Sequence, residues 1–271
     1  MKKDIDNNKI DAPETFSINP LILHKVKKSN QQFYDIISDS YETVDGKRDK
    51  TTIQWITKKL KHIQHASQGE TLLDIGCGSG FILRYAQPYY KTIVGVDISF
   101  TILKSLRQQG HLVVCADSDY LPFKDGSFST ISCFAVLHHL YAYHLLTQEA
   151  YRILKKNGIF YSDHDLDKYF EKRFRVLMLL YRTLFNEEKK YLKANTALTS
   201  ELYHFTEIHH KGIKTENISN LFQRQGFRTV KVTYHWFGLF PIITGLCFFL
   251  GMNSLRFRRG NAPLASIVAT K

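Results

Sequence analysis

The fold is decided by the stretch Leu72-Leu73-Asp74-Ile75-Gly76-Cys77-Gly78-Ser79-Gly80-Phe81. In it, an apolar run ends in a carboxylate, and the chain then turns through three glycines into a helical pattern. Glycine adopts positive φ without strain and lets a ligand approach the backbone, while the start of a helix offers N–H groups. The stretch therefore predicts a strand, a ligand-binding turn and a helix, which together open a nucleotide-binding α/β sheet.

The spacing of this loop favours a sulfonium cofactor over a dinucleotide. The third glycine comes one residue earlier than in the dinucleotide pattern GxGxxG, because Phe81 occupies the later position. Asp74 stands two residues before the first glycine, where it would repel a diphosphate but attract the ammonium and sulfonium charges of S-adenosylmethionine. We expect S-adenosylmethionine as cofactor, and an oxidoreductase that uses a dinucleotide is a distant alternative.

Short β-rich runs alternate with helical patterns around this loop. The runs are 71–75, 92–97, 112–116, 128–134 and 158–163, with helices expected near 81–87, 101–109 and 144–155. Such alternation predicts βαβ units and a doubly wound, Rossmann-like parallel sheet. We expect a disordered tail over 1–30 and a catalytic core over 31–163, which begins with helices from Phe33 onward and over 51–66.

The alternation stops after Asp163. One long amphipathic helix is expected over 168–185 and another over 216–225, which Gly226 would end. We therefore predict a helical substrate cap over 164–226, inserted after the fifth strand. Residues 227–271 should supply the last two strands, near 227–236 and 264–270, joined by an apolar connection.

Two further acids close the second and third predicted strands. Asp97 follows Thr92–Val96, and Asp117 follows Leu112–Ala116. Asp97 can accept both hydroxyls of a ribose, and Asp117 can meet the exocyclic amine of an adenine. An acid at a strand end is often only a turn residue, but three of them at one sheet edge favour a nucleoside site.

The sequence resembles the class I S-adenosylmethionine-dependent methyltransferases, in the branch that includes the quinone and sterol methyltransferases. The segments that carry the resemblance are FYD with YE (33–35, 41–42), LLDIGCGSG (72–80), VGVDIS (94–99), CADSDYLPFKDGSFS (115–129), AVLHHL (135–140) and ILKKNGIF (153–160). They cover the expected core, with Ser129 where the family usually has an aspartate. No match extends over 164–263, the region that selects the substrate.

The resemblance implies a set of residues that bind the cofactor. The glycine loop would hold the methionine part, Asp97 and Ile98 the ribose, and Asp117 and Ser118 the adenine. The full set is Tyr34, Tyr41, Asp74, Gly76, Cys77, Gly78, Gly80, Asp97, Ile98, Asp117, Ser118, Phe134 and Ala135.

A general base is needed only if the acceptor must lose a proton as it is methylated. We propose His138 and His164, near the ends of the fourth and fifth strands, as candidate catalytic residues. One of the adjacent pair His138-His139 is expected to be a satisfied packing residue. Asp163 and His209-His210 are weaker candidates. No metal site is expected, since the four cysteines lack CxxC spacing, and the cysteines are expected to be reduced, buried thiols.

The composition bears on location and partners. The net charge is +12, nearly all of it in residues 151–271, and the start of the chain has no secretory signal pattern, so we expect a cytoplasmic protein. Residues 236–252 carry no charge and precede Arg256, Arg258 and Arg259. Pro241 and three glycines argue against a membrane span, which leaves core packing, a dimer contact or a peripheral membrane patch over 236–259.

These features predict a small-molecule acceptor that is hydrophobic or lipid-like. The first alternative is an RNA methyltransferase of the tRNA type, which the basic charge allows but which lacks a recognisable RNA-binding module. The second is a catalytically silent methyltransferase-like scaffold, which the intact set of cofactor acids disfavours. The oligomeric state is left open.

Overall fold

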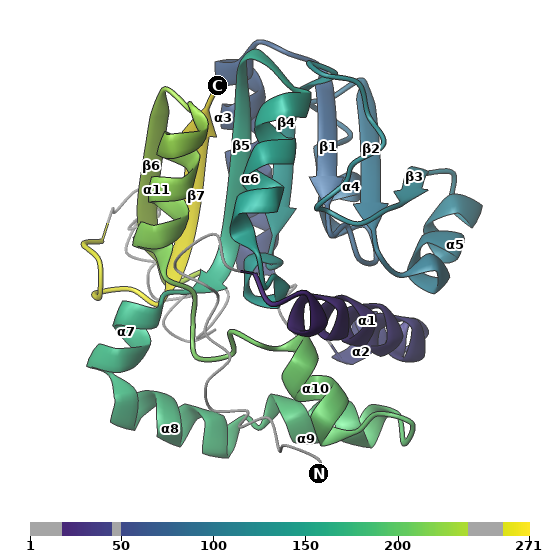
Figure 1. Cartoon of the computed structure of the whole chain (residues 1–271), viewed down its shortest axis with the longest axis vertical. Helices are drawn as coiled ribbons and strands as arrows, with labels where there is room; N and C mark the ends of the chain where they lie inside the picture. The colour runs from purple at the N-terminus through teal and green to yellow at the C-terminus, as the bar shows by residue number, and fades with distance from the viewer. Residues whose placement is uncertain (1–17, 45–49, 238–256) are drawn as a thin grey trace.

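The computed structural model describes residues 18–44, 50–237 and 257–271. Within these residues a seven-stranded sheet has the order β3-β2-β1-β4-β5-β7-β6 (Figure 1). The strands are β1 (Thr71–Ile75), β2 (Thr92–Asp97), β3 (Leu112–Cys115), β4 (Phe128–Phe134), β5 (Leu154–Leu166), β6 (Thr229–His235) and β7 (Leu264–Thr270). All neighbours pair in parallel except β7, which is antiparallel to β5 and to β6. This arrangement confirms the predicted doubly wound α/β fold.

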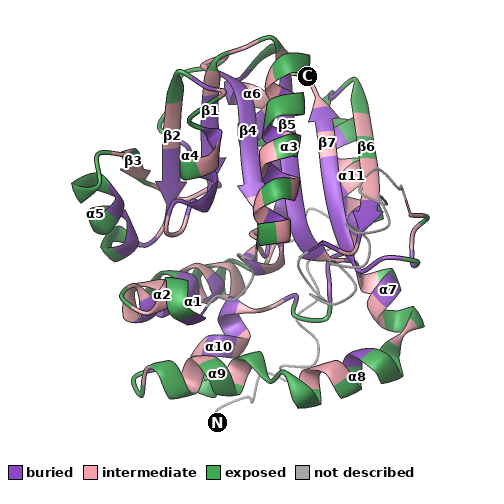
Figure 2. Ribbon diagram, turned by 180° about the vertical axis from the view of Figure 1, so that it is seen from behind, coloured by how far each residue is buried: buried purple, intermediate pink, exposed green. Residues whose placement is uncertain are grey.

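Helices cover both faces of the sheet (Figures 1 and 2). One face packs against α3 (Lys50–Ser67) and α4 (Phe81–Ala86), with α5 (Phe100–Gln108) beside α4. The other packs against α6 (Tyr143–Ile153) and α11 (Thr215–Gln225) over the largest apolar core. Central strands such as β4 are buried along nearly their whole length, as parallel strands covered on both faces must be.

The remaining helices gather beyond the carboxyl ends of the parallel strands (Figure 1). They include the 3₁₀ turn η2 (Leu137–His139) that follows β4, and the short helix α2 (Tyr41–Val44). The others are α1 (Pro20–Ile37), α7 (Lys168–Arg173), α8 (Arg175–Leu184), α9 (Glu187–Ala194) and α10 (Ser200–Thr206). Open α/β sheets bind ligands at this edge, so these helices surround the expected site.

Three sequence-based boundaries need correction. Helix α1 begins at Pro20 with Asn19 as its N-cap, so residues 20–30 are not a disordered tail; residues 1–17 lie outside the described chain. The helix predicted over 168–185 is two helices, α7 and α8, which meet at Phe174. Helix α11 does not belong to the predicted cap over 164–226, because Ile218 and Phe222 pack in the core beside α6.

The apolar connection predicted between the last two strands lies largely in 238–256, outside the described residues. At its described ends, Trp236 donates its indole N–H to the carbonyl of Asn261, and Phe237 is buried in a stack with Trp55. Arg259 pairs with Glu216 and Asp167, and Arg258 is exposed. No helix in the described part of the chain is long and apolar enough to cross a membrane.

Candidate functional site

The glycine loop between β1 and α4 forms the floor of the site. Gly76 has a φ of +67°, and a Cβ there would lie 2.5 Å from Val136, so only glycine fits. Gly80 has a φ of +83° and caps α4. Its backbone brings α4 against α5, since a Cβ would lie 2.7 Å from Leu106. Gly80 therefore shapes the loop and does not line the cavity.

Asp97 at the end of β2 braces this loop. Its two carboxylate oxygens accept the backbone N–H groups of Gly78 and Ser99, each at 2.9 Å. Burial raises the pKa of Asp97, although the hydrogen bonds from these two donors act to lower it. The side chain is nearly buried yet lines the cavity, so its remaining lone pairs face the space above the loop.

Asp74 is the most perturbed carboxyl group of the site. It is buried near the end of β1, and its Oδ1 accepts the hydroxyl of Ser132 at 2.7 Å. Burial raises the pKa of Asp74 to about 8, and nearby Asp97 adds to the rise. A buried acid of this kind binds an added cation strongly, because the cation removes the penalty on its charged form.

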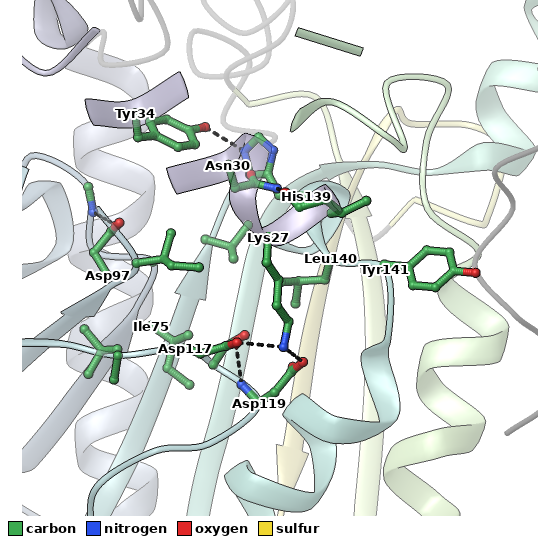
Figure 3. Close-up of a pocket in the computed structure, with 18 of the residues that line it drawn as sticks. Lys27, Asn30, Tyr34, Ile75, Asp97, Asp117, Asp119, His139, Leu140 and Tyr141 are labelled. Carbon is green, nitrogen blue, oxygen red and sulfur yellow. Dashed lines mark hydrogen bonds and ion pairs between the residues drawn. The ribbon is translucent and has the colours of Figure 1, made fainter. Parts of the chain in front are cut away.

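A lysine of α1 forms an ion pair with the aspartate that follows β3. The Nζ of Lys27 lies 2.6 Å from Asp117 Oδ2 and also pairs with Asp119, as Figure 3 shows. Asp117 therefore already has a partner at the place where an adenine amine is expected. Neither Lys27 nor Asp119 was a predicted site residue, because a lysine in an amphipathic helix ordinarily points to solvent.

Most of the predicted cofactor residues line one cavity, which is open to solvent and holds about 850 Å³ of space. Asp74 and Cys77 instead line a smaller cavity that continues from it over the glycine loop and shares Tyr34, Tyr41 and Phe134 with it. The lining residues of the larger cavity include Tyr34, Tyr41, Gly76, Gly78, Asp97, Ile98, Asp117, Ser118, Phe134 and Ala135. The structure thus brings together every predicted cofactor residue except Gly80 along these two cavities.

The N-terminal helices close the cavity from outside the sheet. The hydroxyl of Tyr34 on α1 is 2.8 Å from Nε2 of His139, and the ring of Tyr34 packs edge-on against Tyr41 (Figure 3). His139 also places Nδ1 2.9 Å from the carbonyl of Thr206. His139 is therefore the packing member of the histidine pair, with both ring nitrogens engaged.

A second large cavity adjoins the small one over the glycine loop, between η2, the end of β5 and helices α8 to α10. It holds about 1200 Å³ of space, open to solvent. His138 and Glu207 line both this cavity and the small one over the glycine loop. Polar groups alternate with apolar ones in its wall, which includes His164, Leu166, Met178, Tyr181, Arg182, Phe185, Tyr203, His209, His210 and Leu264.

His138 stands between the second large cavity and the small one over the glycine loop, and Asp165 holds its ring. Its Nδ1 lies 2.8 Å from Oδ1 of Asp165, a fully buried carboxylate that also accepts the His138 backbone N–H at 3.0 Å. The other ring nitrogen, Nε2, lies 3.6 Å from Oε2 of Glu207. Because the carboxylate of Asp165 accepts the proton of Nδ1, Nε2 is the nitrogen that exchanges a proton with the cavity.

The second candidate base, His164, is more enclosed. It has a left-handed backbone with a φ of +70°, and its Nδ1 lies 3.0 Å from Oδ1 of Asp163. Its ring packs against Phe134 with centroids 4.3 Å apart. It lines the second cavity but is nearly buried, so His138 is the better placed of the two predicted bases.

Asp163 is a structural hub and not a base. Its carboxylate accepts hydrogen bonds from Trp55, Tyr161, His164 and His235, the last at 2.6 Å. Burial alone would raise the pKa of Asp163, but His235 and His164 outweigh it and hold the pKa well below the ordinary value. This carboxylate ties α3 and β6 to the end of β5.

Two sets of three side chains in the described residues have metal-ligand composition, namely His138-His139-Glu207 and Asp163-His164-His235. In the first set, Nδ1 of His139 faces a carbonyl and must carry a proton. In the second, the nitrogens of His164 and His235 that face Asp163 must carry protons too. In this structure both sets are therefore hydrogen-bond networks. Of the cysteines, Cys77 and Cys133 are buried thiols as expected, Cys115 is exposed, and Cys247 lies outside the described residues.

Sequence reasoning missed Asp165 and Glu207. Asp165 lies two residues after Asp163 on β5. The alternation of side chains along a strand therefore predicts both acids on the same face of the sheet. Glu207 lies in the helical region after β5, where no family pattern extends.

Residues 73–162 match the family model described as a methyltransferase domain. A malonyl-[acyl-carrier protein] O-methyltransferase of Legionella pneumophila is 30% identical over 45% of this chain and 44% of its own length. A tRNA (carboxymethyluridine(34)-5-O)-methyltransferase of Arabidopsis thaliana is 28% identical over 42% and 26%. A 24-methylenesterol C-methyltransferase of rice is 23% identical over 51% and 44%. The chain spans about half the length of the curated relatives it matches.

Solved structures share the whole arrangement of elements. A SAM-dependent methyltransferase of Thermotoga maritima superposes with a TM-score of 0.52 at 20% identity, over 88% of this chain and 99% of its own. The [4+2]-cyclase SpnF superposes with a TM-score of 0.56 at 16% identity, over 89% and 94%. At these identities the likeness concerns the fold alone. Together with the matched domain, it shows that residues 73–162 carry a methyltransferase domain, within a fold that S-adenosylmethionine-dependent methyltransferases share.

Proposed function

We propose that this chain methylates a small molecule bound in the second cavity, with His138 as the base that removes its proton. The observation that carries the proposal is the place of His138, which lines both that cavity and the cavity over the glycine loop. A group at this junction can reach the acceptor atom as it meets the methyl donor. Asp165 orients the imidazole and stabilises the imidazolium that forms.

The larger cavity and the small one over the glycine loop together fit S-adenosylmethionine by their chemistry. Asp74 offers a buried carboxyl group of raised pKa for the ammonium, Asp97 accepts the ribose hydroxyls, and Asp117 and Ser118 meet the adenine. Gly76, Cys77, Gly78, Ile98, Phe134 and Ala135 supply backbone and apolar contacts, while Tyr34 and Tyr41 cover the opening. The cofactor supplies an electrophilic methyl group on a positively charged sulfur.

The chain's own groups then handle the acceptor. When bound, the cofactor would supply the methyl group to the acceptor lone pair, and its sulfur would keep the electrons of the broken bond. The acceptor proton passes to Nε2 of His138, where Glu207 at 3.6 Å and Asp165 offset the new positive charge. Alignment of the two cavities supplies much of the rate, because the sulfonium is already a good leaving group.

The cavity wall supports an acceptor with a polar head and an apolar body. The wall includes polar side chains, among them several histidines, Glu207 and Arg182, and apolar ones, among them Leu166, Met178, Phe185 and Leu264. This agrees with the hydrophobic, lipid-like class expected from the sequence, acted on by a cytoplasmic or membrane-peripheral enzyme. His164 is retained as a second, weaker candidate for the base.

The test is methyl transfer from labelled S-adenosylmethionine to fractionated cell extract, with the His138→Gln variant in parallel. We expect label in the organic fraction, lost in the variant while cofactor binding is kept. Label in RNA would instead support the tRNA-type alternative, which the name of one relative suggests. Cofactor binding without any labelled product would support the alternative of a catalytically silent scaffold. The fold itself is compatible with that alternative, since a cyclase shares it.

A further inference from the structure

Helix α8 turns an apolar face outward. Val176, Leu180 and Leu184 are 72%, 58% and 76% exposed, and Leu177 and Leu179 are also exposed. At 100° per residue these five side chains fall on one continuous arc of the helix, which holds no charged residue. Figure 2 shows α8 as a largely exposed helix at the edge farthest from the sheet. A monomer has no reason to leave such an arc in water.

The opposite arc of α8 faces the second cavity. Met178, Tyr181, Arg182 and Phe185 line that cavity, and Arg182 pairs with Glu171 at 3.1 Å. The contacts of the inner side chains therefore explain where α8 lies, and the outer side chains do not contribute to its position. Among the described residues, the outer leucines stay exposed and can take part in a contact with a partner.

Cations flank the apolar arc. Residues 168–193 carry eight basic and three acidic side chains, a net charge of +5. Lys172, Arg173 and Arg175 are exposed just before and at the start of α8, and Lys189 and Lys193 are exposed on α9. An apolar stripe flanked by basic residues is the pattern of helices that lie in the surface of an anionic membrane.

We infer that the exposed arc of α8 docks the protein on an anionic lipid surface. The leucines would enter the boundary between headgroups and acyl chains, and the flanking cations would meet the headgroups. A second copy of the chain fits less well, since a two-fold contact through this arc would bring the same cations of both copies together. This contact differs from the one predicted over 236–259, where Arg259 is held by Glu216.

The experiment is sedimentation of the full chain with vesicles of phosphatidylcholine alone or with 30% phosphatidylglycerol. The variant Leu177→Ser/Leu180→Ser/Leu184→Ser is compared with the matched control Leu21→Ser/Leu112→Ser, whose leucines are equally exposed but lie on α1 and β3. We expect the wild type and the control to bind the anionic vesicles, and the α8 variant to bind at least about tenfold more weakly. Lys172→Gln/Arg175→Gln should lower binding about fivefold per charge at low salt, unlike Lys104→Gln/Arg107→Gln on α5.

Cofactor titration and circular dichroism of each variant establish that it is folded, and neither readout depends on methyl transfer. A wild type that ignores anionic vesicles would overturn the inference, as would an α8 variant that binds like the wild type. A dimer in solution that the α8 variant dissolves, without vesicle binding, would identify a second copy as the occupant and also overturn it. Loss of methyl transfer with vesicle binding intact would count against the proposed function alone.

Discussion

His138 and Asp165 form a hydrogen-bonded pair, with Nδ1 of the histidine 2.8 Å from Oδ1 of the carboxylate. The same oxygen accepts the backbone N–H of His138 at 3.0 Å, so the acid fixes both the ring and its backbone. The pair joins η2, after β4, to the end of β5. It therefore holds Nε2 at the boundary of the two cavities without help from a bound ligand.

Asp165→Asn should lower kcat by roughly 10²-fold while the affinity for S-adenosylmethionine stays within about twofold. The amide can present its N–H₂ group to Nδ1, which would move the proton to Nε2 and remove the base. Steady-state kinetics across pH, with cofactor titration, separate the two effects. His209→Gln is the control, since His209 lines the same cavity and its Nε2 lies 3.2 Å from the carbonyl of Leu140. Equal losses in both variants would show that the cavity is merely sensitive to change.

Asp74→Asn should stabilise the empty protein. Burial raises the folded pKa of Asp74 to about 8, from an ordinary value of 3.8. The stability from this group is therefore full below pH 4 and is lost as pH rises toward 8. The asparagine keeps an acceptor for Ser132 and avoids this loss, so the variant should gain about 1–3 kcal/mol at pH 8 and nothing at pH 4. Urea unfolding at both pH values measures the difference, with exposed Asp125→Asn as control.

Cofactor binding should release a proton at pH 7. Asp74 is then mostly protonated in the empty protein, and an ammonium group beside it would favour the carboxylate. Titration calorimetry in buffers of different ionisation enthalpy gives the number of protons released. We expect a release approaching one proton in the wild type, none in Asp74→Asn, and binding at least about tenfold weaker in that variant. Proton uptake in the wild type would contradict the assignment.

The sequence predicted the sheet well because its signals are local. The loop from Asp74 to Gly80 and the predicted strand at 264–270 reappear where they were expected. The helix start at Pro20 after Asn19 is a single feature in a stretch interpreted as polar and aperiodic, although Ile22, Val26 and Phe33 of α1 follow a helical spacing.

The base and its partners depend on contacts between distant segments. Lys27 meets Asp117 across 90 residues of sequence, and Glu207 reaches His138 from the helices that follow β5. No local pattern encodes such a meeting, because it results from how α1 and α10 pack over the sheet edge. For the same reason, the sequence offered Asp163 as well as His138 as a candidate base, although the structure buries Asp163 among its hydrogen-bond donors and places His138 beside a cavity.

Asp163→Asn should destabilise the protein by about 3–5 kcal/mol, since it leaves His235, His164, Trp55 and Tyr161 without the charge that they share. The folded pKa lies below the ordinary value, so the stability from this group is present above about pH 4 and is lost as pH falls further. Urea unfolding at pH 7 and in acid measures both effects. Asp165→Asn serves as comparison, and a smaller loss there would distinguish the hub from the positioning acid.

Asp97→Ala should weaken cofactor binding by about 1.5–3 kcal/mol, the value of a charge-assisted hydrogen bond. The loss has two sources that a second variant separates. Alanine removes the acceptor for the ribose and also releases the N–H groups of Gly78 and Ser99, which loosens the loop. Asparagine keeps one acceptor oxygen, so Asp97→Asn should recover part of the affinity. Titration calorimetry with S-adenosylmethionine measures both variants against Asp39→Asn, an exposed acid just after α1. If Asp97→Ala bound the cofactor as the wild type does, the site would lie elsewhere and the proposed reaction would lose its structural basis.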